Sequence, residues 1–534
     1  MAATKLLVFV LGLGRRRDDE LLARLTSEFG AEWRIEIVAN ELRLFSHDKL
    51  DDAVNDLVAS IAEFAGDSTG ERADTTDIVL CGHSLGGLLV RAAFVDAMAD
   101  HAAFNDGTKN WARKVRRVVL LGSPNAGFDP THLPWLWQVV YWVFCQPRTK
   151  LLVEQIRAGG YWITNLRLGW VEAVRGRQDV HVVQVLASDD ELVHETDVED
   201  SRYLGPTSTL WMPRTDHSGM VDLSHADTAE SRWEVLRNAI AGNDLPRVAP
   251  VPVSKDPVVF IVHGIRASAH EQWVSRATAA IQARGGADVH IQATNYGFFS
   301  AIQFALPFTR RGNVKRFLRD YGRWFTTHDA DNFHFLGHSN GTYMLGKALQ
   351  EVRTMRFTRV LLAGSVLPPD YDWSARVDAG QVLQVRNDRA SHDFPVGILC
   401  SLLNGLKQDV GRGGYTGFVG LPVAVSQPAA TFPKGHGSAL EDHTEARYPP
   451  RMPEVAEFLL GGTLPPDPLD TQNLDAFMRF SNAVGVTLFG AIVLLAIPTV
   501  IIVALVVWAQ LTVWAAIAIT LAILAVGYVA LRSV

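Results

Sequence analysis

Residues 78–87 read IVLCGHSLGG, an apolar run that ends in Ser84, with a glycine two residues away on either side. The run predicts a buried strand, and the pattern after it predicts a helix. In a tight turn from strand to helix the serine backbone is strained and its neighbours are crowded, which favours glycine. The following helix would direct its first N–H groups at a developing negative charge. The turn therefore has the form of a nucleophile elbow.

The same plan occurs twice. Residues 333–341, FHFLGHSNG, repeat the pattern around Ser339. Because strands alternate with helical segments in both halves, we predict an α/β fold with two mostly parallel sheets covered by helices on both faces. Each half has four further features in the same order: an apolar run ending in glycine before the serine, and after it a third strand, a strand leading to an acid, and a histidine. In the first half these are residues 8–13, 118–124, 180–190 and 217–222. In the second half they are residues 259–265, 360–365, 382–393 and 436–441.

Clusters of proline and glycine divide the chain. Prolines crowd residues 246–257, which predicts a linker between a first domain (1–245) and a second (258–460). Residues 461–482 begin GGTLPP and predict another linker.

The tail is uncharged from residue 480 to residue 531. A bilayer-spanning helix needs about 20 apolar residues. We therefore predict a membrane hairpin with spans at 483–508 and 511–531; a helical hairpin buried in a soluble core is the alternative. Arg479 and Arg532 would lie on one side of the bilayer, which indicates that this side is cytoplasmic.

The amino terminus resembles a signal peptide only in part. Lys5 is followed by an apolar stretch, but RRRDDE comes next at 15–20 and no small-residue cleavage site follows. A first strand is the better interpretation. We expect the protein to be anchored at its C-terminus, with both domains in the cytoplasm.

Composition excludes several classes of protein. Of the 534 residues, 48% are hydrophobic and 20% charged, which excludes a disordered chain. The net charge of −7 disfavours a nucleic-acid partner. The only cysteines are Cys81, Cys145 and Cys400, far apart and without metal-ligand spacing, so neither a disulfide framework nor a zinc site is expected.

Both halves resemble enzymes of the α/β-hydrolase fold, in the serine esterase and lipase branch. Residues 82–87, GHSLGG, are similar to the lipase elbow, and residues 122–127, GSPNAG, look like the family's segment after the next strand. The resemblance covers residues 4–460 as two tandem copies and leaves out the tail. The family order of nucleophile, acid and histidine is met in both copies.

The resemblance implies a triad in the first copy. Ser84 would be the nucleophile and His217, followed by Ser-Gly-Met-Val, its base. The family pattern places the acid three residues before a valine, here Val193, which selects Asp190; Asp189 is the alternative.

In the second copy the resemblance implies the same roles for Ser339, Asp393 and His436. The spacing of Asp393 to a following valine repeats that of the first copy. Asp388 competes as the acid and His443 as the base.

By the same resemblance, pairs of backbone N–H groups form the oxyanion holes: Leu85 with Leu13, and Asn340 with Ile265. His263-Gly264 matches the family's loop, whereas the first copy has leucine in place of that histidine. The histidines before the serines, His83 and His338, would pack behind the elbows.

The first copy carries an aromatic insertion at about residues 128–175, where the family places its cap. It includes Trp137 and Trp142 and suggests an apolar substrate pocket, although an ordinary packed helical cap is the alternative. Arg15-Arg16-Arg17 and Arg266 could receive an anionic headgroup, or could simply be a solvated helix start.

These features predict a membrane-anchored serine hydrolase that cleaves esters of lipids or other apolar acyl compounds. No metal or organic cofactor is implied, and the expected partners are the ester substrate and the bilayer. An acyltransferase or thioesterase would use the same triad, and a membrane scaffold with one or both copies non-catalytic is the rival from another class.

Overall fold

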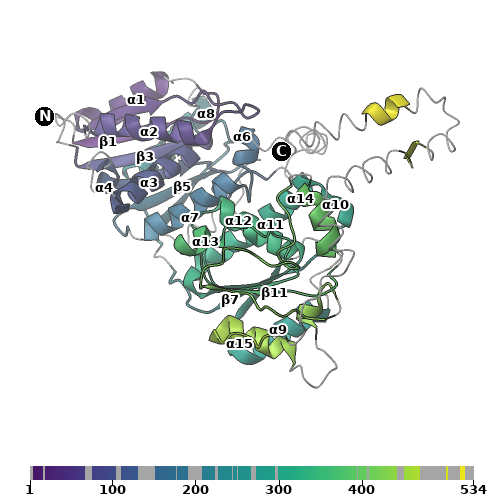
Figure 1. Ribbon diagram of the computed structural model, residues 1–534. Coiled ribbons are helices and arrows are strands. Elements are labelled where there is room, and N and C mark those ends of the chain that lie inside the picture. Colours follow the sequence, from purple (N-terminus) through teal and green to yellow (C-terminus); the bar gives the residue numbers. More distant parts are fainter. Residues whose placement is uncertain are drawn as a thin grey trace. The chain divides into compact units, whose positions relative to one another are not determined.

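The computed structural model describes residues 4–15, 19–66, 75–103, 110–129, 151–175, 177–190, 207–222, 226–242, 245–248, 251–265, 272–294, 299–393, 395–405, 408–433, 435–441, 450–468, 499, 501–502 and 517–522. The chain divides into two compact units (Figure 1). The first comprises Met1–Val253 with Tyr321–Thr327, and the second comprises Ser254–Asp320 with His328–Val534.

A parallel sheet forms the centre of the first unit. Its order is β2-β1-β3-β4-β5-β6, and every neighbouring pair is parallel. The strands are β1 (Lys5–Val10), β2 (Trp33–Val38), β3 (Asp77–His83), β4 (Val115–Leu121), β5 (His181–Ala187) and β6 (Thr207–Met212).

Helices cover both faces of this sheet. Helices α1 (Asp19–Phe29) and α8 (Ala226–Ala241) bury leucines and Trp233 against Leu7, Phe9 and Val119 of the strands. The other helices are α2 (Leu50–Ala65), α3 (Leu85–Ala103), α4 (Trp111–Lys114), α6 (Leu152–Gln155) and α7 (Tyr161–Arg175). Of these, α3 contacts both α2 and α7.

The second unit repeats this topology. Its sheet has the order β8-β7-β9-β10-β11-β12, again with parallel neighbours. The strands are β7 (Val258–Val262), β8 (His290–Thr294), β9 (Phe333–His338), β10 (Phe357–Ala363), β11 (Val382–Asp388) and β12 (Val425–Ser426).

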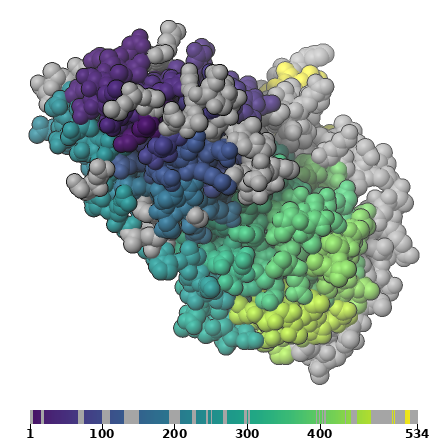
Figure 2. All heavy atoms as spheres, turned by 90° about the vertical axis from the view of Figure 1, so that its left-hand side faces the viewer, coloured from purple at the N-terminus to yellow at the C-terminus, as the bar shows by residue number. Residues whose placement is uncertain are grey.

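Helices α9 and α15 pack together on one face of the second sheet, and α11 and α12 lie on the other (Figure 1). The residues of α15 form part of the surface in Figure 2. The helices of this unit are α9 (Gln272–Gly285), α10 (Ala301–Ala305), α11 (Pro307–Thr327), α12 (Asn340–Glu351), α13 (Trp373–Asp378), α14 (Ser401–Gly405) and α15 (Arg451–Gly461), with a π-helical turn at Pro395–Cys400. The last residues of α11, Tyr321–Thr327, are grouped with the first unit.

The predicted α/β class with two parallel sheets is therefore confirmed. In both sheets the first two strands in the chain lie on one side of the third, so β3 and β9 are interior strands flanked by parallel neighbours. The predicted linker is partly paired: Val248 forms an antiparallel bridge with Thr207, and Ser254 a parallel bridge with His328.

Most of the predicted cap insertion, including Trp137 and Trp142, lies outside the described residues. Its last part is α7, which packs on α3. Trp170 of this helix is buried edge-to-face against Phe94 at 5.7 Å between ring centroids, and the Arg91 guanidinium lies 5.2 Å from the Trp170 ring. This part of the insertion therefore belongs to the core of the unit.

The two predicted membrane spans lie outside the described residues except for Thr499, 501–502 and 517–522. Within the described part of the chain, no helix combines the length and the apolar character needed to cross a bilayer.

Candidate active site

The first serine turn has a strained backbone held by close packing. Ser84 lies between β3 and α3 with φ 53°, in the left-handed region that a residue with a Cβ seldom adopts. A Cβ on Gly82 would come 2.5 Å from the Gly86 carbonyl oxygen, and one on Gly86 would collide with the Val10 carbonyl oxygen. The two glycines are therefore required because backbone segments meet on both sides of the serine.

Three of the predicted side chains meet at this turn. His217 Nε2 is 2.8 Å from Ser84 Oγ, and His217 Nδ1 is 2.9 Å from Asp190 Oδ2. Asp190 follows β5, and its side chain is 2% exposed, whereas the His217 side chain is 17% exposed. The competing Asp189 is exposed, and its backbone N–H donates to the Thr215 carbonyl. The fold thus brings Asp190 to the histidine and turns Asp189 toward solvent.

His83 and Arg15 form hydrogen bonds with backbone carbonyls of the loop that carries His217. His83 Nε2 lies 2.9 Å from the His217 carbonyl oxygen, and burial lowers the pKa of His83 to about 3. His83 is therefore neutral near pH 7 and can donate its Nε2–H to that carbonyl. Arg15 Nη2 donates to the Ser218 carbonyl at 2.8 Å. Arg15 thus serves the loop, while Arg16, Arg17 and Arg266 lie outside the described residues.

The loop after β1 approaches the serine closely. A Cβ on Gly12 would lie 3.2 Å from Ser84 Cβ, so this loop passes beside the elbow. Leu13 follows in the same loop, and Leu85 is the first residue of α3. N–H groups in the first turn of a helix have no partner four residues back within it. Both predicted oxyanion donors therefore belong to segments that flank Ser84.

The second unit has the same turn. Ser339 lies between β9 and α12 with φ 51° and is 4% exposed. A Cβ on Gly341 would collide with the Val262 carbonyl oxygen, and one on Gly264 would lie 2.8 Å from Ser339 Cβ. Ile265 continues the loop after β7, and Asn340 opens α12, as their counterparts do in the first unit.

Its acid and histidine are also in contact. His436 Nδ1 lies 3.0 Å from each carboxylate oxygen of Asp393, which is fully buried. Asp388 has different partners: Arg386 donates to it at 2.7 Å, and Arg451 pairs with its other oxygen. Asp388 is thus the centre of a buried ion-pair network, while His443 lies outside the described residues.

The two sets differ at the serine. No hydrogen bond joins Ser339 to His436, although both belong to the described part of the chain. The ring centroids of His338 and His436 are 4.5 Å apart, against 5.3 Å for His83 and His217. Burial and the neighbouring His436 hold the pKa of His338 well below its usual range. The second set therefore has the acid–histidine pair but not the link to its serine.

Two glycines with left-handed backbones face the histidines, a role that the sequence patterns had not indicated. Gly122 (φ 50°) follows β4, and a Cβ there would lie 3.3 Å from His217. Gly364 (φ 53°) follows β10, and a Cβ there would lie 3.1 Å from His436. Their matched places after the third strand of each half were the signal that could have identified them.

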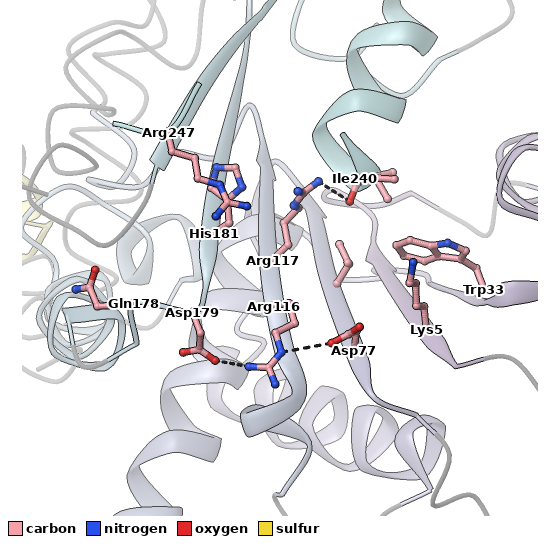
Figure 3. A pocket seen from close by; sticks show the side chains of 12 residues that line it. Lys5, Trp33, Asp77, Arg116, Arg117, Gln178, Asp179, His181, Ile240 and Arg247 are labelled. Carbon is pink, nitrogen blue, oxygen red and sulfur yellow. Dashed lines mark hydrogen bonds and ion pairs between the residues drawn. The ribbon is translucent and has the colours of Figure 1, made fainter. Parts of the chain in front are cut away.

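A separate hollow of about 270 Å³ lies at the opposite end of the first sheet (Figure 3). It is lined by residues where strands begin, such as Lys5 and His181. Arg116 pairs with Asp77 and Asp179 across it, and Arg117 donates to the carbonyl oxygens of Ala239, Ile240 and Gly242 at the end of α8. These arginines therefore tie strands and a helix end together, away from Ser84.

Comparison with known proteins gives weak similarities. No protein-family model matches the chain, and no curated protein matches it. Among solved structures, a monoacylglycerol lipase from Paleococcus ferrophilus is 14% identical, with 45% of this chain and 96% of that chain covered and a TM-score of 0.29.

Two further structures are similar at the same level. A carboxylesterase structure from Nitrososphaera gargenis is 14% identical over 44% of this chain and 89% of its own, with a TM-score of 0.28. A phospholipase from Legionella pneumophila, solved with thio-NAD, is 11% identical over 49% of this chain and 71% of its own, with a TM-score of 0.32. Similarities of this size carry no argument about activity, so the function has to be inferred from the geometry of the two sites.

Proposed function

We propose that the first unit is a serine hydrolase of the α/β-hydrolase family that cleaves carboxylic esters. One observation carries the proposal: Asp190, His217 and Ser84 are joined by hydrogen bonds of 2.9 and 2.8 Å at a strained strand-to-helix turn. Such a chain of acid, imidazole and hydroxyl activates a serine that is otherwise a poor nucleophile.

The reaction would proceed by acyl transfer to the serine. Ser84 Oγ attacks the ester carbonyl carbon while His217 Nε2 accepts its proton. Asp190 accepts a hydrogen bond from His217 Nδ1–H and stabilises the imidazolium that forms. The bond to the alcohol then breaks, and His217 returns the proton to the leaving oxygen. Water then attacks the carbonyl carbon of the acyl-enzyme while His217 accepts its proton. This step releases the acid and regenerates Ser84.

The negative charge on the carbonyl oxygen needs fixed donors. We assign this role to the backbone N–H groups of Leu85 and Leu13, which flank the serine. Each such donor is typically worth about 3 kcal/mol of transition-state stabilisation. Because both are backbone groups on the β1 loop and the start of α3, their positions follow from the fold rather than from side-chain rotamers.

We propose the same chemistry for the second unit, through Ser339, Asp393 and His436, with Asn340 and Ile265 as donors. Catalytic hydrogen bonds are often incomplete without substrate, so the missing serine–histidine bond is compatible with activity. That same missing bond favours a second candidate, in which this unit binds a ligand without cleaving it.

The substrates we propose are esters of lipids or other apolar acyl compounds, cleaved at a membrane to which the chain is anchored by spans at 483–508 and 511–531. The uncharged tail supports this proposal, as do the exposed apolar side chains of Ile519 and Leu521. With Arg479 and Arg532 on the same side, both units would be cytoplasmic. Reporters fused before Met1 and after Val534 should then report the cytoplasm; two different compartments would contradict the hairpin.

Hydrolysis of p-nitrophenyl esters by the full chain tests the activity. Ser84→Ala, in a background where Ser339→Ala silences the second unit, should remove turnover, whereas Ser27→Ala on the exposed face of α1 should not. The kcat/KM should be higher for medium or long acyl esters than for acetate, and each well-buried large apolar group should contribute about 1–3 kcal/mol to this difference. Turnover that survives the double Ser→Ala change would refute the proposed chemistry.

A further inference from the structure

Three possible metal ligands converge in the second unit, away from its serine. Asp256, His290 and His328 each offer one ligand atom, and these atoms lie within 4.8 Å of one another. Asp256 precedes β7, His290 begins β8, and His328 follows α11. Because parallel strands begin at one edge of the sheet and Ser339 follows the end of β9, the cluster and the triad lie at opposite edges.

The spacing is close to that of a bound ion. His290 Nε2 lies 3.9 Å from Asp256 Oδ2, and the two imidazole ring centroids are 4.7 Å apart. Ligand atoms about 2.0–2.2 Å from a tetrahedral zinc ion lie roughly 3.4 Å apart. Small side-chain rotations, which exposed groups make readily, would close the remaining distance.

Backbone hydrogen bonds hold the three segments together. The Asp329 N–H donates to the Ser254 carbonyl at 2.8 Å, and the His290 N–H donates to the Pro257 carbonyl at 2.9 Å. Ser254 Oγ also donates to Asp256 Oδ2 at 2.7 Å, which orients the carboxylate. Hydrogen bonds of this kind orient metal-binding side chains and are typical of built sites.

The burial of one ligand and the exposure of the other two suit a cation. His328 is 8% exposed and is the buried member of the cluster. The side chains of Asp256 and His290 are 48% and 39% exposed, which leaves a path for an ion and room for water ligands.

We infer that Asp256, His290 and His328 bind one divalent transition-metal ion, with zinc suited to two imidazoles, one carboxylate and a water. These donors suit zinc better than the hard cations, which prefer oxygen ligands alone. The ion would link the starts of β7 and β8 to the segment after α11, so that its first effect is to stabilise this edge of the sheet. The inference is independent of the proposed ester hydrolysis.

Zinc titration of the full chain tests the inference. After removal of metals with a chelator, calorimetric titration with a zinc salt should show one site per chain, and thermal unfolding should move to higher temperature as zinc is added. His290→Ala should weaken that binding by more than about a hundredfold, since loss of groups that only orient ligands already costs 10–100-fold. His47→Ala, which removes an exposed histidine from the first unit, is the matched control and should bind as the unchanged chain does.

Asp256→Asn is a second variant, and it removes an exposed carboxylate charge with little change of shape. It should also weaken zinc binding and reduce the rise in unfolding temperature, while the metal-free variant unfolds as the metal-free parent does. The inference is overturned if the parent chain binds no zinc, or if both variants bind it with unchanged affinity.

Discussion

Gly122 offers a sharp test of how the fold positions His217. Its φ of 50° lies in the left-handed region, and a Cβ there would be 2.8 Å from Met220 Sδ and 3.3 Å from both His217 Cε1 and Nδ1. Gly122→Ala would therefore strain the backbone and also push on the side chains that pack around the imidazole. Gly30 provides the control, because its φ is 62° but nothing lies within 4 Å of a Cβ there.

Backbone strain and the close contacts of the new Cβ have different expected consequences. Left-handed backbone costs a residue with a Cβ roughly 1–2 kcal/mol, so both variants should lose about that much unfolding free energy. Gly122→Ala should lose more than Gly30→Ala, because its Cβ also presses on Met220 Sδ. In Gly122→Ala, Met220 Sδ must also move by roughly 0.6–1.2 Å from its 2.8 Å separation to reach an ordinary van der Waals contact. Since a misplacement of about 1 Å can cost a factor of 10² in rate, we expect kcat to fall about 10- to 100-fold.

The assay is p-nitrophenyl ester hydrolysis by the full chain carrying Ser339→Ala, so that only the first unit contributes. Urea unfolding of the same samples gives the free energies. Gly122→Ala should lose activity and Gly30→Ala should keep it, while both variants remain folded. If the two variants have kcat values within twofold of each other, Gly122 does not position His217 and the reasoning fails.

Three other outcomes are expected from the described contacts. Asp190→Asn should lower kcat of the first unit by about 10³–10⁴, whereas Asp189→Asn should leave it within twofold, as steady-state kinetics in the Ser339→Ala background can show. Asp388→Asn should cost about 3–5 kcal/mol in urea unfolding, because it leaves two buried arginines without their shared carboxylate; a loss below 1 kcal/mol would contradict the network. Acidification should destabilise the protein: burial lowers the pKa of His83 and His334 to about 3, so below about pH 6.5 the unfolded chain binds protons that the folded chain does not. Each should remove about 1 kcal/mol per pH unit between pH 6.5 and pH 3, and a stability that is flat between pH 7 and pH 5 would refute this.

The elbows could be predicted from sequence because their cause is local. Gly86 is needed because α3 passes close to the Val10 carbonyl, and Gly341 because α12 passes close to the Val262 carbonyl. The glycine spacing in the sequence is therefore a direct consequence of a backbone contact. The parallel sheets could be predicted from the repeated run of apolar segments, since parallel strands need helical crossovers between them.

Other features depend on contacts between distant segments. Asp189 and Asp190 are adjacent, and only the turn after β5 decides which of them faces His217. Asp388 sits at the end of β11, where Arg451 from α15 meets it, a pairing that no local pattern encodes. The ligand cluster around His328 could not be predicted from the sequence for the same reason. Its members come from separate segments, whereas the spacing rules for metal sites describe ligands close together in sequence.

The central claim is that Ser84 is a nucleophile activated by His217. Fluorophosphonate labelling of the full chain, followed by peptide mapping, tests it most directly, because the reagent reports an activated serine whatever the natural substrate. We predict a labelled peptide containing Ser84, none from the first unit of Ser84→Ala, and labelling of Ser339 at least about tenfold slower, since that hydroxyl lacks a hydrogen bond to its histidine. Unchanged labelling of the first unit in Ser84→Ala, or no labelling of Ser84 in the intact chain, would contradict the account.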